Sequence, residues 1–511
     1  MYKRRLIALL LCLLFALAAV LSACGTSSEE SDTSSGELSQ TSQPVSDSKY
    51  IDANGKYWPV YSDGIKDQII GDRTEVRVLV YDNTIQTTYY SEEIEPDMYS
   101  TTDSTLNEAV RERNNYVLQQ LGIEIKAVPV EDVGATVKTE LTAGTGDFDI
   151  AMPFLGACAS LAQTNSFYDL KQFEEKGIID LSAPWYEQNA NDTFSIQNRL
   201  YFTVSDMTIM HKIVSSAILY NPEMIESKYP DLDIFQMVVD GDWTLDEMIR
   251  IGKEFAEDSD GNGVHDYTDN WGLVTSYNTA SGFYLASGEK LCTKNEEDVP
   301  IIAINGERSV TVSQKVLDTL QDGTWVLHAN SLTGVGDIWT TALSVFGDGR
   351  SAFYTTAFSA IKKLRAYDID YRIVPYPKID DLQEEYITPG GGQYAYGVVI
   401  LNTLSEEDAD FAAYMIDVLS AGGKQYIATA YYDQILKHKD ALSDEDKSVD
   451  MLDLIFENIV YDVSLIYDFG GIGSIHQTLM TENSTDIVSK LESIRSAVEQ
   501  KIDEIVEQYS K

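Results

Sequence analysis

This chain of 511 residues lacks cysteines and histidines in the spacing of a zinc site or a redox site. It has four cysteines without a C-x-x-C pair, and its five histidines lack the spacing of zinc ligands. No G-x-S-x-G, H-E-x-x-H or glycine-rich phosphate loop stands in the structural context that its chemistry requires. A zinc centre, a redox centre and the common hydrolase mechanisms are therefore not expected, and we predict that the protein is not an enzyme.

Positive charge is also scarce. There are 37 Lys and Arg against 82 Asp and Glu, which gives a net charge of −45. Such a surface repels nucleic acid and anionic lipid headgroups, so we predict no nucleic-acid partner. Solubility explains the acidity better than a cationic ligand does. Hydrophobic residues still make up 44% of the chain and aromatic residues 10%, which is typical of a globular protein.

The first twenty-four residues have the pattern of an export leader. Lys3, Arg4 and Arg5 precede an apolar run over residues 6–20, which is too short for a stable membrane span. Leu-Ser-Ala then stands before Cys24 and resembles the bacterial lipobox, whose cysteine is acylated before cleavage. We expect a signal peptide over residues 1–23 and a palmitate-type lipid anchor on Cys24, which would hold the protein outside the cell membrane. An ordinary signal peptide is the alternative.

A tether follows the leader. Residues 24–50 are dominated by Ser and Thr and carry too little apolar surface to fold. About 460 residues remain, which is enough for two or three domains. Because Cys12 lies in the leader and Cys24 in the lipobox, Cys158 and Cys292 are expected to be free thiols.

The first part of the body alternates between strand and helix patterns. Strands are predicted at 75–81, 123–130 and 147–153, and helices at 105–121 and 135–141. This β-α-β-α-β order predicts a doubly wound parallel sheet, whose ligand crevice lies at the carboxyl ends of the strands. An amphipathic helix is also predicted at 487–509, as a cover for one domain or, alternatively, as a partner for another helix.

One acidic loop has the pattern of a calcium site. Residues 258–269 (DSDGNGVHDYTD) place oxygen-bearing side chains at positions 1, 3, 5, 9 and 12, with glycine at position 6. The predicted ligands are the following residues: Asp258, Asp260, Asn262, the Val264 carbonyl, Asp266 and Asp269. Residues 244–256 supply an entering helix, but the exit looks like a strand, so we expect a structural calcium ion rather than an EF-hand switch. A solvated polar loop is the alternative.

Several short motifs resemble one protein family in their order. They are DFDIAMP at 147–153, FYDL at 167–170, LYF at 200–202, AILYN at 217–221, WTLD at 243–246, FGDGRSAF at 346–353, VPYP at 374–377 and GGGQYAY at 390–396. Across residues 73–500 this order is similar to the extracellular solute-binding proteins, family 1, of bacterial ABC importers of carbohydrates. Phe353 stands where that family has methionine, and the chain is longer than its common members.

The resemblance implies an α/β fold of two doubly wound lobes joined by a hinge, of the type II periplasmic-binding-protein kind, with extra C-terminal helices. Crossings between the lobes are expected near 203–206, near 389–394 and after residue 432. Lobe one would contain residues 73–203 and 394–435, and lobe two would contain residues 204–393 and 436–511. The implied partners are a small-molecule solute and the permease of an ABC importer, and we expect a monomer.

A sugar site needs flat rings for stacking and polar groups for hydroxyls. The candidate ligand-binding residues are Asp82, Asp149, Trp185, Asp206, Trp339, Tyr354, Phe358, Tyr394 and Tyr396. The leading hypothesis is a receptor for a carbohydrate, especially an oligosaccharide; a receptor for a peptide or another small solute is the alternative. A secreted glycoside hydrolase is disfavoured, because acidic neighbours such as Glu92 with Glu93 and Glu384 with Glu385 do not face each other across a bond and are expected on the solvated surface.

Overall fold

The structure is a computed structural model that describes residues 47–61, 64–85, 87–437 and 445–510. The predicted leader, Cys24 and most of the tether lie outside the described residues. Residues 47–511 form one compact unit. The end of the predicted tether is corrected: η1 (Asp47–Tyr50) is a helical turn, and Tyr50 is fully buried with its ring 5.0 Å from that of Trp185. Folded structure therefore begins before residue 50.

The first sheet is parallel, as predicted. Its strands are β1 (Glu75–Tyr81), β2 (Glu124–Val130) and β3 (Ile150–Ala151), in the order β2-β1-β3. The linking helices are α3 (Ser104–Leu121) and α4 (Val133–Ala143). Helix α3 ends at Gly122, whose φ of 72° is the left-handed conformation that glycine adopts without strain. The predicted β-α-β-α-β order is thus confirmed, with a third strand much shorter than 147–153.

A second, five-stranded sheet has the order β10-β4-β9-β5-β8. Its strands are β4 (Ser216–Tyr220), β5 (Trp271–Thr275), β8 (Val326–His328), β9 (Ser351–Ala357) and β10 (Arg372–Val374). Strands β9, β5 and β8 are parallel, but β4 runs antiparallel to both of its neighbours. The second sheet is therefore mixed, with one antiparallel strand inside it. The chain enters β4 from a connecting segment, α8 (Met210–Val214), rather than by the helical return that parallel neighbours need.

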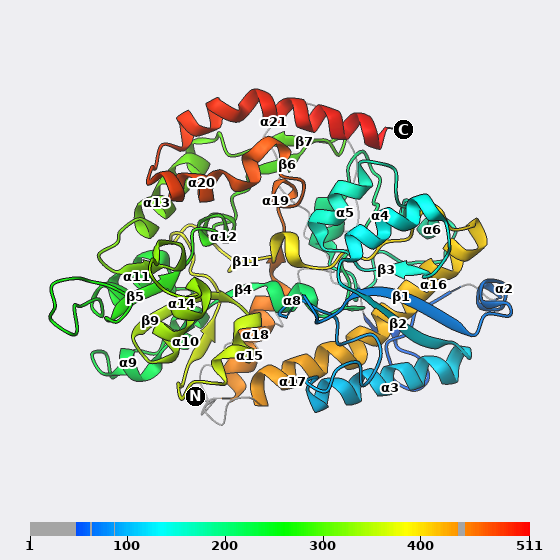
Figure 1. Ribbon diagram of the computed structural model, residues 1–511, viewed down its shortest axis with the longest axis horizontal. Helices are drawn as coiled ribbons and strands as arrows, with labels where there is room; N and C mark the ends of the chain where they lie inside the picture. Colours follow the sequence, from blue (N-terminus) through cyan, green and yellow to red (C-terminus); the bar gives the residue numbers. More distant parts are fainter. Residues whose placement is uncertain (1–46, 62–63, 86, 438–444, 511) are drawn as a thin grey trace, which may run out of the picture. The chain divides into compact units, whose positions relative to one another are not determined.

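The remaining elements cover the sheets and connect them (Figure 1). The helices before β5 are α2 (Ile65–Ile70), α5 (Leu155–Ala162), α6 (Lys171–Glu175), α7 (Gln188–Phe194), α9 (Pro222–Glu226), α10 (Ile234–Asp240) and α11 (Leu245–Lys253). After β5 they are α12 (Thr279–Ala286), β6 (Cys292–Lys294), β7 (Pro300–Ile302), α13 (Glu307–Leu320), η2 (Ala329–Ser331), α14 (Ile338–Gly347), α15 (Ser359–Leu364), β11 (Thr388–Pro389) and η3 (Gly392–Tyr394). The C-terminal set is α16 (Glu406–Gly422), η4 (Gly423–Ala428), α17 (Thr429–Lys437), α18 (Glu445–Glu457), β12 (Ile459–Val460), α19 (Val463–Tyr467), η5 (Phe469–Ser474), α20 (Ile475–Glu482) and α21 (Ile487–Tyr509).

The segment at residues 396–401 joins distant parts of the chain. It forms antiparallel bridges from Val399 to Ala151, from Val398 to Thr203 and from Leu401 to Phe167. This segment is therefore a row of isolated bridges rather than a continuous strand. It nevertheless returns the chain to the first sheet, where α16 then packs beside α2 and α3.

The C-terminal helix α21 has the predicted bounds. It packs on η5, α20 and α13, and Tyr509 contacts the rings of Tyr201 and Tyr467. Helix α21 thus covers more than one part of the fold (Figure 1). Cys158 and Cys292 are buried free thiols. Within the part of the chain that the structure describes, no helix is long and apolar enough to cross a membrane.

A buried carboxyl group on α16 gives the fold a pH dependence. Asp417 accepts hydrogen bonds from the Trp185 indole at 2.8 Å and from the hydroxyls of Tyr186 at 3.0 Å and Tyr61 at 3.1 Å. Burial raises the pKa of Asp417 to about 7, although these three donors oppose the rise. Between about pH 4 and that value, the folded chain holds a proton that the unfolded chain has released.

We expect the stability contributed by Asp417 to fall as pH rises from about 4 to about 7. The free energy of unfolding should lose about 1.4 kcal/mol per pH unit from this group. Asp417→Asn should remove that slope, whereas Asp231→Asn, at an exposed residue, should keep it. Urea unfolding at several pH values measures both. Equal slopes for the wild type and Asp417→Asn would contradict the assignment.

Candidate functional site

Three of the predicted ligand-binding aromatic residues are engaged in packing within the protein. Trp185 is 1% exposed and bonded to Asp417, and Tyr396 is fully buried with its hydroxyl donating to the Tyr89 carbonyl at 2.9 Å. Tyr354 lies in β9 and stacks on Phe346 at 5.5 Å. Trp185 and Tyr396 therefore have no free face for a ligand, whereas Tyr354 is only half-buried.

Three other candidates also lie apart from a common site. Asp149 stands at the amino end of β3, where it pairs with Arg77 at 2.9 Å, whereas the crevice of such a sheet lies at the carboxyl ends. Asp82 does follow β1, but its carboxylate accepts from the amide and hydroxyl of Thr84. Trp339 is 49% exposed at the start of α14.

Asp206 is buried in a network of charges. The Lys212 ammonium lies 2.6 Å from its carboxylate and 2.7 Å from His211 Nε2, which lies 3.2 Å from Glu187. Burial opposes the charge of Asp206, but Lys212 and His211 outweigh it and lower the pKa of this carboxyl group. Asp206 is thus satisfied within the protein, and it anchors the connecting segment rather than presenting oxygens to a solute.

A cavity lies between the segments that follow β1 and β9. It has a volume of about 140 Å³ and is open to solvent. Its walls are formed by Thr87, Thr88, Tyr90, Glu92, Ile213, Phe358, Ser359, Ile361, Lys362, Lys363, Arg365, Tyr431 and Ile435. We call this the cleft cavity. Both sheets contribute to it through loops at strand carboxyl ends, and α8 and α17 complete it, so it has the position expected of a ligand site.

An exposed ring stands beside the cleft cavity. Tyr394 is 54% exposed and stacks on Tyr89, with centroids 5.3 Å apart and planes at 24°. Tyr89 lies between Thr88 and Tyr90, which line the cavity. Burial raises the pKa of Tyr89, opposed by a hydrogen bond with Ser359, another lining residue. Of the predicted ligand-binding residues, Phe358 thus lines the cavity and Tyr394 adjoins it.

The prediction that Glu92 and Glu93 lie on the solvated surface was wrong. They are 4% and 1% exposed. Glu92 lines the cavity, where it accepts from Tyr90 at 3.2 Å and pairs with Lys362 at 2.5 Å, and Glu93 accepts from Thr208 at 2.5 Å. Glu384 and Glu385 are exposed, as expected. Sequence reasoning also missed Lys362, Lys363 and Arg365, although a basic run after a strand end in so acidic a chain could have indicated them.

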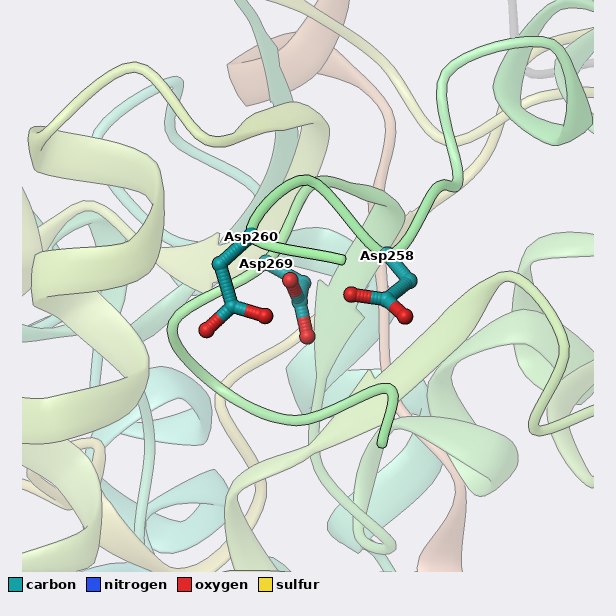
Figure 2. Close-up of side chains that lie close together, drawn as sticks. All are labelled: Asp258, Asp260 and Asp269. Atoms are coloured by element: carbon teal, nitrogen blue, oxygen red, sulfur yellow. The ribbon is translucent and has the colours of Figure 1, made fainter. Parts of the chain in front are cut away.

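The predicted calcium loop brings three carboxylates together. Asp258, Asp260 and Asp269 point toward one another (Figure 2), and one oxygen of each lies within 4.8 Å of the others. Asp258 accepts the Gly263 amide at 2.8 Å, and the φ of 81° at Gly263 provides the expected turn. Asp266 is not in this group, and its carboxylate instead accepts from Thr268.

These carboxylates fit a hard cation by their chemistry. Within the described ranges, Asp258, Asp260 and Asp269 have no Lys, Arg or His ion pair, so only neutral donors oppose their mutual repulsion. These donors are backbone amides, the Ser259 hydroxyl and the Asn262 side-chain amide. For the buried Asp269, desolvation opposes the charge, but amides of Asp266 and Ser259 lower its pKa. The residues that could hold the ion are the three aspartates, with Asn262 and the Val264 carbonyl nearby in the loop.

The network around Asp206 predicts a strong effect of removing its cation. Lys212→Met should leave His211 as the only ion-pair partner of the Asp206 and Glu187 carboxylates among the described residues, and should cost about 3–5 kcal/mol, because a buried charge loses its main compensation. Lys138→Met, at an exposed residue of α4, should change stability little. Chemical denaturation measures both. A loss below about 1 kcal/mol for Lys212→Met would contradict the network.

Comparison with known proteins identifies the family. A family model described as bacterial extracellular solute-binding protein matches residues 114–420. The fold is similar to that of the cyclic α-maltosyl-1,6-maltose binding protein from Arthrobacter globiformis, which is 14% identical with a TM-score of 0.54, over 84% of this chain and 99% of that one. A cyclo/maltodextrin-binding protein complexed with maltotetraose is 13% identical with a TM-score of 0.51, over 86% and 98% of the two chains.

UgpB from Mycobacterium tuberculosis, in complex with glycerophosphocholine, is 12% identical with a TM-score of 0.52, over 84% of this chain and 98% of its own. No curated protein matches the chain. The structural matches establish the α/β periplasmic-binding-protein-like fold. Because the family model also covers more than half of the sequence, the chain belongs to the bacterial extracellular solute-binding proteins.

Proposed function

We propose that the protein is a membrane-anchored receptor that captures a carbohydrate in the cleft cavity and delivers it to an ABC importer. The main support is the exposed Tyr394 ring, stacked on Tyr89 at the rim of a cavity built from both sheets. A flat aromatic face suits the C–H faces of a sugar ring, and the hydroxyls of Thr87, Thr88 and Ser359 suit its polar rim. Lipid on Cys24 would keep the receptor near its permease, which raises their effective concentration.

The proposed mechanism is closure of two lobes around the solute. The lobes would comprise residues 73–203 with 394–435 and residues 204–393 with 436–511. The cavity draws Tyr90 from the first and Phe358 from the second. Only a closed form lets both sides contact one solute, so binding shifts an existing equilibrium toward it, and the permease can recognise that form.

Another small solute is the alternative within the same class. UgpB of similar fold is described in complex with glycerophosphocholine, so this architecture is not restricted to sugars. A peptide is also compatible with a cavity that has aromatic, aliphatic and charged side chains in its wall. The tyrosine pair favours the carbohydrate, because stacking on a rigid exposed ring is characteristic of sugar recognition rather than of extended peptide binding.

The stacking role of Tyr394 can be tested with oligosaccharides. We expect mono- and oligosaccharide screening by thermal shift on the full chain to find a ligand that raises the melting temperature. Tyr394→Ala should then weaken its binding by about tenfold, the equivalent of about 1.4 kcal/mol. Tyr267→Ala, at another exposed tyrosine, is the matched control and should keep the affinity. Calorimetric titration measures both variants. Unchanged affinity in Tyr394→Ala would refute the stacking role of this ring, and tight binding of peptides alone would refute the carbohydrate proposal.

We further propose that the loop at residues 258–269 binds a structural calcium ion. The specific observation is the group of three carboxylates without a cationic side chain. The loop lies between α11 and β5, so an ion there would fix the connection between a helix and the second sheet. Bound calcium would supply the positive charge that this group lacks and restrain the loop.

Calcium should stabilise the protein through these carboxylates. At a concentration one hundred times its dissociation constant, one ion adds about 2.7 kcal/mol to the free energy of unfolding. Asp260→Asn preserves the side-chain shape but removes one charge, and should reduce the calcium-induced rise in melting temperature. Asp231→Asn should retain it. Scanning calorimetry with calcium or a chelator distinguishes them, and identical responses in both variants would exclude this loop as the site.

A further inference from the structure

The cleft cavity carries positive charge in a protein that is otherwise strongly acidic. Its charged wall residues are Lys362, Lys363, Arg365 and Glu92, three cations against one carboxylate. The whole chain has the opposite balance, 37 cations to 82 acids. All three cations come from a single short stretch at α15, just after β9 ends, so the local sequence concentrates them at the cavity.

The one carboxylate of the wall is already occupied. Glu92 is buried and receives the Tyr90 hydroxyl on one oxygen and the Lys362 ammonium on the other. These contacts neutralise Glu92 and hold Lys362 at the wall, with its ammonium 5.9 Å from the Tyr90 ring centre. Glu92 is therefore poorly placed to accept protons from sugar hydroxyls, which is the usual role of a carboxylate in such a site.

The other two cations stand without an ion pair in the part of the chain that the structure describes. Within the described ranges, neither Lys363 nor Arg365 lies within 4.0 Å of a carboxylate. Asp337 attracts Lys363 only by longer-range electrostatic interaction, and Asp103 and Glu92 attract Arg365 in the same way. Partial burial lowers the pKa of the Arg365 guanidinium, and these weak attractions do not fully offset that effect. The cavity thus holds donor groups and positive charge that the protein itself does not neutralise.

We propose that the solute carries an anionic group, which Lys363 and Arg365 bind in the cleft cavity while Lys362 is positioned there by Glu92. The inference rests on the proposed carbohydrate function. Together, the two proposals make the solute an acidic sugar that bears a carboxylate, sulfate or phosphate. Arginine offers a planar fork of donors to such a group, and lysine adds a compact charge.

The size of the cavity supports binding of a substituent or a single ring. Its volume of about 140 Å³ is below the 300–1,000 Å³ of typical ligand pockets. An oligosaccharide would therefore place its charged unit in the cavity and extend the rest toward Tyr394, which is the exposed ring beside it. Charge recognition and stacking then act on different parts of one solute.

Matched acidic and neutral ligands test the inference. Calorimetric titration of the full chain would use digalacturonate with α-1,4-galactobiose, and glucose 6-phosphate and glucose 6-sulfate with glucose. Inorganic phosphate serves as the non-sugar probe. We expect at least one acidic compound to bind ten times or more tightly than its neutral partner, and its affinity to fall as salt is raised. Arg365→Gln and Lys363→Gln should each reduce that affinity about tenfold or more, whereas Lys138→Gln should not.

Each result separates this inference from the carbohydrate proposal. If neutral sugars bind as well as acidic ones and both α15 variants retain full affinity, the anionic solute is refuted and the carbohydrate receptor stands. If only phosphate or another non-sugar anion binds, with loss in Arg365→Gln, the anion site is supported and the carbohydrate proposal fails. If no anion binds, the inference is overturned. Circular dichroism of each variant establishes that it is folded.

Discussion

The arrangement of the cleft depends on the close packing of residues 205–206, which precede α8, against the junction of α16 and η4. A side chain on Gly423, at the start of η4, would overlap the carbonyl oxygen of Asp206, so the two backbones approach as only glycine permits. The Ser205 and Ser420 hydroxyls share a hydrogen bond of 2.7 Å at the same contact. The side chain of Asp206 is held by Lys212, one turn before β4 begins. Backbone contact and buried charge together determine where the second sheet starts.

This packing also decides which groups are available to a solute. Asp206 turns its carboxylate to Lys212 and His211, and Trp185 gives its indole N–H to Asp417. The polar groups nearest the connecting segment are thus used to hold the protein together. The cleft cavity, where we propose that the solute binds, is instead lined by groups on the loops after β1 and β9, which the two sheets hold in position. The cavity is therefore distinct from the network that supports it.

Local patterns in the sequence predicted the fold well, whereas the site required contacts that no local pattern contains. Strand β1 and helix α21 have the predicted bounds, because apolar spacing and end signals are local properties. Glu92 looked like a solvated acid because its partner, Lys362, stands 270 residues away. Trp185 and Tyr396 were selected for their chemistry, but their burial depends on residues that pack against them from distant segments. The direction of β4 is likewise not a local property, since strand direction follows the route of the connecting chain.

The contrast between an acidic surface and a cationic cavity has a physical consequence for recognition. A net charge of −45 would repel an anionic solute at long range, but at physiological salt the Debye length is about 8 Å, so distant charges act weakly. Within the cavity, the nearest charges are those of Lys363 and Arg365, and the low-dielectric wall of Phe358 and Ile361 strengthens their field. A small anion that reaches the cavity would meet attraction there, while an extended polyanion would still meet the acidic surface around it. Selectivity for small charged solutes over polymers then follows from the position of a few cations rather than from the total charge.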